Sequence, residues 1–327
     1  MTRPVDVAAL LAEAYDRSPR AVARLLSLVE DQAPQLPEVM AALAPRAGRA
    51  HIVGLTGAPG VGKSTVTSAL VSAYRARQLR VAVLAVDPSS PFSGGALLGD
   101  RIRMQVHALD SDVFVRSMSS RGHLGGLSSA APQAIRVLDA VGYDVVIVET
   151  VGVGQSEVEV VDLADTTVVL LAPGMGDGVQ AAKAGVLEVG DLFVVNKADR
   201  DGARVTERDL RGMLRMGSGA RSGPPDDPWA PPVIRTVATE GTGIDALLTG
   251  LGEHHEWLAR TGVLAVRKRA RAEREMRAIA LGLLRSRLYE GTGAQRAHEL
   301  AEQVVAGSLD PFAAAEMLIA STGGESR

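Results

Sequence analysis

The sequence predicts an α/β fold in which a mostly parallel central sheet is flanked by helices, with helical extensions at both ends of the chain. Seven short runs rich in apolar and β-branched residues lie between residues 50 and 245, and stretches of helical pattern separate them. Runs this apolar are typical of strands covered on both faces, and their alternation with helices indicates parallel crossovers. We therefore expect an N-terminal helical extension (1–48), a sheet domain (49–246) and a C-terminal helical region (247–327).

The seven predicted strands share this apolar character. In chain order they are HIVGLTG (51–57), RVAVLAVD (80–87), DVFVRSM (112–118), YDVVIVET (143–150), TTVVLLAP (166–173), DLFVVNKAD (191–199) and PPVIRTVA (231–238).

The segments outside the sheet have helical periodicity. Residues 5–45 contain the amphipathic run AVARLLSLVE and a second run that restarts after two prolines. The stretch 217–232 is rich in Gly and Pro, which favours a mobile surface loop. In 274–290 the apolar residues fall on one helical stripe. We expect the extensions to be helical and the last of them to carry an apolar face.

Composition excludes several classes of protein. The 327 residues include 35 basic and 38 acidic side chains, 46% hydrophobic residues, 3% aromatics and no cysteine. The basic run RKRARAEREMR lacks interleaved aromatics, so we expect a solvated helix face or a dimer arm and no nucleic-acid partner. No segment has the length of a membrane span, and the N-terminus lacks the apolar run of a signal peptide. The chain is predicted to be cytoplasmic, without thiolate metal sites.

A phosphate-binding motif follows the first predicted strand directly. GLTGAPGVGKST contains the spacing G-x-x-x-x-G-K-[ST], and a helical stretch comes after it. Glycines let backbone N–H groups turn toward a phosphate, and the helix N-terminus adds its positive end. Lys63 can reach the β and γ oxygens, and the Ser64 hydroxyl can ligate Mg²⁺. The predicted phosphate-binding residues are Gly57, Ala58, Pro59, Gly60, Val61, Gly62, Lys63, Ser64 and Thr65. The fold is therefore predicted to be that of a P-loop NTPase.

A second motif indicates which base is bound. NKAD ends the sixth predicted strand, at the sheet edge where open α/β sheets bind ligands. Asp199 can accept from N1–H and the exocyclic amine of guanine, and the stem of Lys197 can lie on the base. Adenine would leave that carboxylate unpaired, and such a mismatch discriminates strongly. We predict a GTP site that comprises Asn196, Lys197 and Asp199, with Val237 and Ala238 from the end of the last strand.

Three carboxylates are predicted to surround one Mg²⁺ ion. Asp87 ends the second strand, Asp100 follows the loop after it, and Glu149 ends the fourth strand. We expect Asp87 and Glu149 in the inner or water-mediated shell and Asp100 to move as the loop orders. The alternative is that Asp100 caps the helix that begins there.

The segment ETVGVGQSE resembles a D-x-x-G switch with Glu149 in place of Asp, so that the Gly152 N–H would sense the γ-phosphate. The next residue is Val153 rather than glutamine, and Gln155 is a distant candidate for orienting water. Slow intrinsic hydrolysis follows from this, with Arg101, Arg103 or Arg121 as possible arginine fingers. The predicted catalytic residues are Lys63, Asp87, Asp100, Glu149, Gly152 and Gln155.

Together, GLTGAPGVGKST, VDPSSPFSGGALLGDRIRM, ETVGVGQSE, PGMGDGVQAAKAG and VVNKAD resemble the MeaB/ArgK/MMAA family of P-loop GTPases. The resemblance implies a GTPase chaperone of adenosylcobalamin-dependent acyl-CoA mutases, chiefly methylmalonyl-CoA mutase, that guards cofactor loading. It also implies a homodimer formed through the C-terminal helices. In that family a further segment relays nucleotide state to the mutase. Here it keeps Asp177, Gln180 and Lys183 but has Gly178 and Val179 where an acidic residue and leucine are common.

Two other interpretations concern the partner and the metal. An ATP-dependent kinase of amino-acid transport proteins is the main alternative, and NKAD argues against it because it specifies guanine. The family's metal-insertion relatives carry a cysteine motif for a bare ion. This chain has no cysteine and only scattered histidines, so ferrying of free Ni²⁺ or Zn²⁺ is not expected. The pair His254–His255 is predicted to lie on a solvated helix.

Overall fold

The computed structural model describes residues 5–88, 107, 109–120, 130–150, 160, 162–174, 189–216 and 223–321. The chain divides into two units, Met1–Lys268 and Arg269–Arg327. The first unit contains the sheet and the N-terminal helices, and the second contains most of α12 together with α13 and α14.

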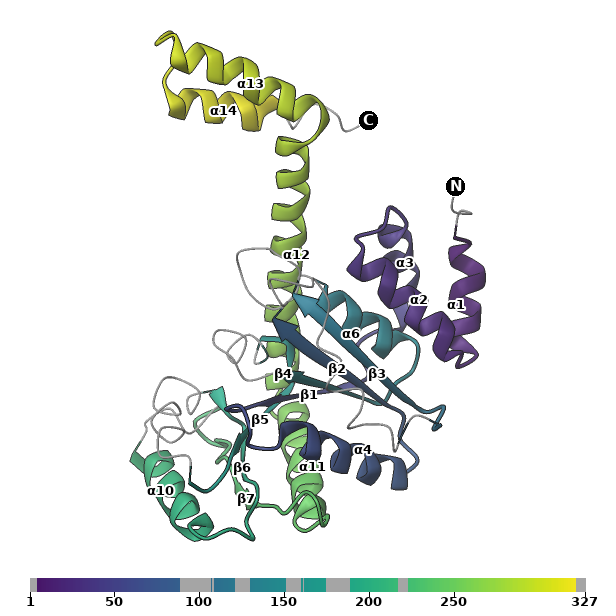
Figure 1. The fold of residues 1–327 in the computed structure, drawn as a ribbon, viewed down its shortest axis with the longest axis vertical. Helices are drawn as coiled ribbons and strands as arrows, with labels where there is room; N and C mark the ends of the chain where they lie inside the picture. Colours follow the sequence, from purple (N-terminus) through teal and green to yellow (C-terminus); the bar gives the residue numbers. More distant parts are fainter. Residues whose placement is uncertain are drawn as a thin grey trace. The chain divides into compact units, whose positions relative to one another are not determined.

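The first unit is built on a parallel sheet, seen near the centre of Figure 1. Its strands, in the described part of the chain, are β1 (His51–Thr56), β2 (Val81–Pro88), β3 (Val113–Ser120), β4 (Val145–Thr150), β5 (Thr166–Leu171), β6 (Leu192–Val195) and β7 (Val233–Arg235). The spatial order is β3-β2-β4-β1-β5-β6-β7, and every neighbouring pair is parallel. Each of the seven predicted strands is present, and the predicted α/β fold is confirmed.

Helices cover both faces of this sheet, as alternation along the strands requires. On β4, Val146 and Val148 join one buried cluster, whereas Val145 and Ile147 join the cluster on the opposite face. The first cluster is covered by α6 (Ala131–Ala140) and the N-terminal helices, and the second by α4 (Lys63–Ala76) and α11 (Ile244–Arg260). Figure 1 shows α4 and α11 on one side of the sheet and α6 on the other. Toward β6 and β7, α10 (Ala203–Met216) covers a third cluster.

The predicted N-terminal helices are α1 (Val7–Tyr15), α2 (Pro19–Glu30) and α3 (Leu36–Leu43), followed by a short turn η1 (Ala44–Arg46). Asp6 and Ser18 cap the first two through their side-chain oxygens, and Pro19 begins α2 where its missing N–H is not needed. Their apolar faces belong to the same buried cluster as α6 and the adjacent strands. The three helices therefore form an outer layer over α6 within the first unit.

The chain after α11 is helical, as expected. The helices are α12 (Val263–Tyr289), α13 (Gly291–Val305) and α14 (Pro311–Ser321). None of the side chains described along α12 is buried, and Met276, Ile279 and Leu283 are 63%, 41% and 57% exposed. Helices α13 and α14 contact each other. No helix among the described residues combines the length and the apolar character needed to cross a membrane.

The Gly- and Pro-rich stretch before β7 is described from residue 223 onward. Trp229 Nε1 donates to the Asp191 carbonyl at 2.8 Å, and Trp257 Nε1 of α11 donates to the Asp227 carbonyl at 3.0 Å. The two indole rings lie 5.6 Å apart. The described part of this stretch is therefore anchored to β6 and α11, which the sequence interpretation as a mobile loop did not anticipate.

Candidate functional site

The predicted phosphate loop joins β1 to α4 at the carboxyl edge of the sheet. Gly57 has φ +142°, and a Cβ at this position would collide with the Leu170 carbonyl oxygen of β5. Gly62 has φ +96°, and a Cβ there would lie 2.5 Å from Asn196 Nδ2. These two glycines are required because the loop passes close to the ends of β5 and β6. The first turn of α4 then begins at Lys63, so its free backbone N–H groups face the loop and can bind an anion.

Lys63 is buried, with 6% of its surface exposed. Its ammonium donates to the carbonyl oxygens of Gly57 at 2.6 Å and Ala58 at 3.2 Å, so the side chain folds back over the loop. A cation held by the carbonyls of a phosphate-binding loop is placed to move onto phosphate oxygens when these enter the loop.

Glu149, at the end of β4, faces the start of α4. Its Oε1 accepts from Ser64 Oγ at 2.7 Å, and its Oε2 lies 2.8 Å from Thr67 Oγ1. All three side chains are buried, with 4%, 7% and 0% of the surface of Glu149, Ser64 and Thr67 exposed. The predicted pairing of Ser64 with Glu149 is therefore present in the structure. Thr67 was not among the predicted site residues, although its spacing of three from Ser64 places both hydroxyls on one face of a helix.

Asp87 lies beside this pair in the sheet. On β2, Ala85 is the register partner of Glu149, and Asp87 follows two residues later. Only the backbone of Asp87 is described, so its predicted role at the metal remains a prediction. No group of three His, Cys, Asp or Glu side chains that could hold a metal ion occurs within the described residues.

Several predicted site residues lie outside the part of the chain that the structure describes. They are Asp100, Gly152, Gln155, Asp177, Gln180 and Lys183, together with the candidate fingers Arg101, Arg103 and Arg121. Their predicted roles in hydrolysis, switching and partner coupling are not tested by the geometry.

The predicted base-binding motif is tied to the phosphate loop through Asn196. Its Nδ2 donates to the Val61 carbonyl at 2.9 Å, and its Oδ1 accepts from Thr236 Oγ1 at 3.0 Å and from the Ala238 N–H at 3.3 Å. Asn196 is 2% exposed and therefore acts as a buried crosslink. It holds the loop after β1, the end of β6 and the segment after β7 together. Thr236 was not predicted, because its role depends on a contact between segments 40 residues apart.

Lys197 and Asp199 follow this crosslink. Lys197 has φ +56°, and its ammonium donates to the Gly60 carbonyl at 2.7 Å, so the side-chain stem runs along the phosphate loop. Asp199 is exposed, and Val237, which pairs with Thr242, is half-buried beside the buried Ala238. An exposed carboxylate next to an aliphatic lysine stem can accept from a base while the stem covers its face.

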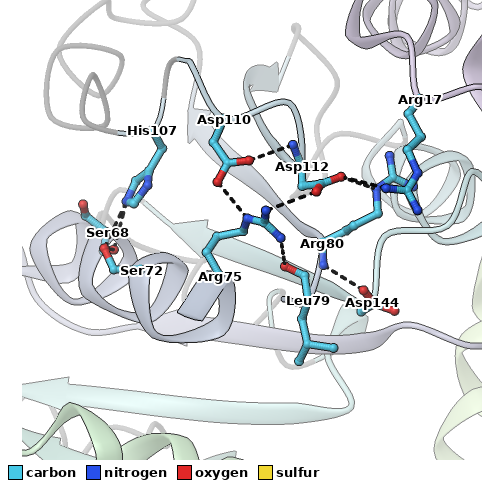
Figure 2. Close-up of polar contacts among 10 residues, drawn as sticks. All are labelled: Arg17, Ser68, Ser72, Arg75, Leu79, Arg80, His107, Asp110, Asp112 and Asp144. Atoms are coloured by element: carbon cyan, nitrogen blue, oxygen red, sulfur yellow. Dashed lines mark hydrogen bonds and ion pairs between the residues drawn. The ribbon is translucent and has the colours of Figure 1, made fainter. Parts of the chain in front are cut away.

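The far end of α4 is fixed by ion pairs, shown in Figure 2. The Arg75 guanidinium contacts Asp110 at 2.8 Å and Asp112 at 3.1 Å, and the hydrogen bond from Arg75 lowers the pKa of Asp110. His107 Nε2 lies 3.3 Å from both the Ser68 carbonyl and Ser72 Oγ. The segment that leads into β3 therefore grips the outer side of the helix that carries Ser64 and Thr67.

The histidine pair is not on a solvated helix face, and that prediction was wrong. His254 is fully buried: its Nδ1 lies 2.8 Å from Thr166 Oγ1 and its Nε2 lies 3.3 Å from Asp191 Oδ1. His51 Nε2 contacts the same hydroxyl at 2.8 Å, and its ring lies 4.2 Å from that of His255. Burial, with the charge of His255 second, lowers the pKa of His51 well below its usual value, and burial also lowers the pKa of His255.

Arg267 completes this network at the amino ends of β1, β5 and β6, opposite the phosphate loop. Its guanidinium donates two hydrogen bonds of 2.9 Å to Asp191 and one of 2.7 Å to the Asp165 carbonyl. Burial alone would raise the pKa of Asp191, but its contacts with His254 and Arg267 lower the pKa to about 2. The network attaches the start of α12 and the middle of α11 to the sheet, which is a structural role.

Comparison with known proteins adds a family to this geometry. The family profile described as "Methylmalonyl Co-A mutase-associated GTPase MeaB" matches residues 22–293. A Pyrococcus abyssi protein named "Putative GTPase" is 46% identical over 300 residues, 92% of each chain. "GTPase ArgK" of Escherichia coli is 41% identical and covers 69% of each chain. "Methylmalonic aciduria type A homolog, mitochondrial" of Mus musculus is 35% identical over 82% of this chain and 64% of its own.

A solved structure also matches nearly the whole chain. The structure titled "Crystal structure of LAO/AO transport system kinase" has a TM-score of 0.70 and 25% identity, and the match covers 97% of this chain and 98% of that one. The comparison supports the P-loop α/β fold.

Proposed function

The chain belongs to the MeaB family of GTPases, and from this premise we propose that it binds and hydrolyses GTP as a chaperone of an adenosylcobalamin-dependent acyl-CoA mutase. Its role would be to gate cofactor loading and to protect the mutase, with methylmalonyl-CoA mutase as the first candidate. The relatives named GTPases and the mutase in the family description support this proposal.

The observation that carries the nucleotide part is the crosslink at Asn196. A buried amide that binds the phosphate loop and also the segment after β7 sets a fixed distance between the phosphate site and the base site. Lys197 and Asp199 then follow at the position where a guanine would lie. The carboxylate of Asp199 can accept two hydrogen bonds from guanine but faces an acceptor on adenine.

The residues at the start of α4 fit a magnesium ion. The donors are the Ser64 hydroxyl and the Glu149 carboxylate, both oxygen ligands, beside a loop suited to phosphate. Mg²⁺ is usually held by one or two carboxylates together with substrate phosphates, so a cage of protein ligands is not needed. Bound there, Mg²⁺ would neutralise charge that develops on the phosphate oxygens.

The protein's own residues do the rest of the work in this proposal. Lys63 leaves the carbonyls of Gly57 and Ala58 and pairs with the β and γ oxygens, while the N–H groups of α4 bind the phosphate from below. Asp87, Asp100, Gly152 and Gln155 are proposed to complete the metal and γ-phosphate side. Because Val153 stands where a water-positioning glutamine is common, we expect slow hydrolysis that the partner accelerates.

Two further parts of the proposal concern assembly. Asp177, Gln180 and Lys183 are proposed to relay nucleotide state to the mutase. The C-terminal helices are proposed to form a homodimer, which the exposed apolar side chains along α12 support. We expect the protein to act in the cytoplasm, as the absence of cysteine from the sequence also favours.

A second candidate function is an ATP-dependent kinase of amino-acid transport proteins, because the matched crystal structure carries such a title. The two candidates differ in the base they need, and Asp199 favours guanine. A kinase would also transfer phosphate to a protein acceptor, whereas a switch would release it as inorganic phosphate.

The test is phosphate release from GTP and from ATP at several protein concentrations, with and without a purified adenosylcobalamin-dependent acyl-CoA mutase from the same source. The Lys63→Ala variant serves as the matched inactive control. The proposal expects GTP hydrolysis that the mutase stimulates and little use of ATP. Hydrolysis of GTP that no mutase changes would remove the partner from the proposal, and preferred use of ATP would favour the kinase.

A further inference from the structure

Thr67 makes a contact that the phosphate-binding motif does not include. It lies one turn beyond Lys63 on α4, is fully buried, and places its hydroxyl oxygen 2.8 Å from Glu149 Oε2. Ser64, on the same face of the helix, holds the other oxygen of that carboxylate at 2.7 Å. Two hydroxyls from α4 therefore hold both oxygens of one carboxylate that belongs to β4.

This arrangement restricts the orientation of the carboxylate group. A single contact from Ser64 would leave the plane of the Glu149 carboxylate free to rotate about its last side-chain bond, which is a soft torsion. A second contact on the other oxygen removes that freedom. The oxygen beside Ser64 is then held where the proposed metal would lie.

Thr67 has a second acceptor, which defines the competing structural explanation. Its hydroxyl also lies 3.0 Å from the Lys63 carbonyl, the bond to residue i−4 that threonines commonly make inside helices. Thr206 on α10 makes only such a bond among its described contacts, to the Gly202 carbonyl at 3.2 Å, and is likewise buried. A hydrogen bond to a carboxylate is stronger than one to a carbonyl, which favours the contact with Glu149. Thr206 thus offers a control for the loss of the helix bond alone.

We propose that Thr67 is a positioning residue that orients the Glu149 carboxylate toward Ser64 and thereby sets the affinity of the nucleotide-bound protein for Mg²⁺. The inference rests on the proposed GTPase function and adds to it a residue outside the phosphate-binding motif. The phosphate loop itself does not depend on Thr67, so nucleotide binding without metal is unaffected by it.

The experiment measures Mg²⁺ binding without relying on turnover. The protein is saturated with GDP in a metal-free buffer, MgCl₂ is titrated in, and the rise in melting temperature reports binding of the ion to the folded state. The Thr67→Val variant removes the hydroxyl at nearly constant volume, Thr67→Ala removes it without β-branching, and Thr67→Ser restores it. Thr206→Val is the matched control.

We expect the Mg²⁺ concentration for half of the melting-temperature rise to increase about tenfold in Thr67→Val and Thr67→Ala, the change expected for loss of one hydrogen bond to a charged group. Thr67→Ser should stay within about twofold of the original protein, as should Thr206→Val. GDP affinity in EDTA should be the same in all of them. If Thr67→Val does not fold, Thr67→Ala still decides the question.

Two results would overturn the inference, and they differ from each other. If the original protein binds GDP and responds to Mg²⁺ but Thr67→Val and Thr67→Ala respond in the same way, Thr67 only supports the helix. If the original protein binds GDP and shows no response to Mg²⁺, the metal part of the proposed function fails together with this inference.

Discussion

Replacement of Arg267 by methionine tests the ion pair at the amino edge of the sheet. The change removes the guanidinium that donates two 2.9 Å hydrogen bonds to Asp191 but keeps an apolar stem. Asp191 has only 5% of its side chain exposed, so its charge loses a partner that water cannot replace. Loss of one member of a buried pair destabilises proteins by about 3–5 kcal/mol. For a domain of this size we expect a fall in melting temperature of roughly 10 °C.

The pH dependence of the same variant gives an independent magnitude. The pKa of Asp191 is lowered from 3.8 to about 2, which corresponds to about 2 kcal/mol of stability. Because the folded-state pKa is the lower one, this stability is present above pH 3.8 and is lost as the pH falls toward 2. In Arg267→Met the pKa of Asp191 rises, so stability should depend less on pH between 4.5 and 3.

The assay is urea unfolding at pH 7, 4.5 and 3, with Lys268→Met as the control. Lys268 is the next residue of α12 and makes a single exposed hydrogen bond to the Gly48 carbonyl, so its loss should change the free energy of unfolding by less than about 0.5 kcal/mol. GDP affinity should be unchanged in both variants, because the network lies at the edge opposite the phosphate loop. Equal stability of Arg267→Met and Lys268→Met at pH 7 would refute the reasoning.

Three further predictions concern the crosslink, the buried histidine and the phosphate loop. Asn196→Ala removes one donor and one acceptor that together make three buried hydrogen bonds, so GDP affinity measured by calorimetry should fall about a hundredfold or more; a change below threefold would contradict the crosslink. His51 has a lowered pKa, so the unfolded chain binds more protons below pH 6.5 and stability is lost as the pH falls; His51→Gln should reduce the loss between pH 7.5 and 5.5 in urea midpoints, and an unchanged loss would count against it. Lys63→Ala should abolish nucleotide binding, and an unchanged calorimetric GDP affinity would show that its ammonium does not reach the phosphates.

The strands and the phosphate loop could be predicted from the sequence because the signals that define them are local. A parallel strand covered on both faces is an apolar run, and a loop that passes within contact of β5 and β6 must have glycine at Gly57 and Gly62. Both signals are visible within about ten residues, a span comparable to a single strand and turn. The same holds for the caps Asp6 and Ser18, which precede their helices directly.

The contacts of Thr67, Thr236 and His254 could not be predicted in this way. Each depends on a partner 40 to 88 residues away, Glu149, Asn196 and Thr166 respectively, and on the register between separate elements. Two adjacent histidines on a helix are usually solvated, and only the packing of α11 against β5 and β6 buries His254. Local pattern identifies residue types suited to a role, whereas the sheet order decides which of them meet.

The most direct test of the guanine-nucleotide site is calorimetric binding of GDP, ADP and xanthosine diphosphate to the original protein and to Asp199→Asn. The account predicts that the original protein binds GDP at least about a hundredfold more tightly than ADP, since a polar mismatch at a base-reading carboxylate discriminates strongly. It also predicts that Asp199→Asn, which exchanges an acceptor for a donor, loses GDP and gains the xanthine nucleotide. Equal binding of ADP and GDP, or a variant that still prefers GDP, would contradict the assignment of Asp199 and of the site built around Asn196.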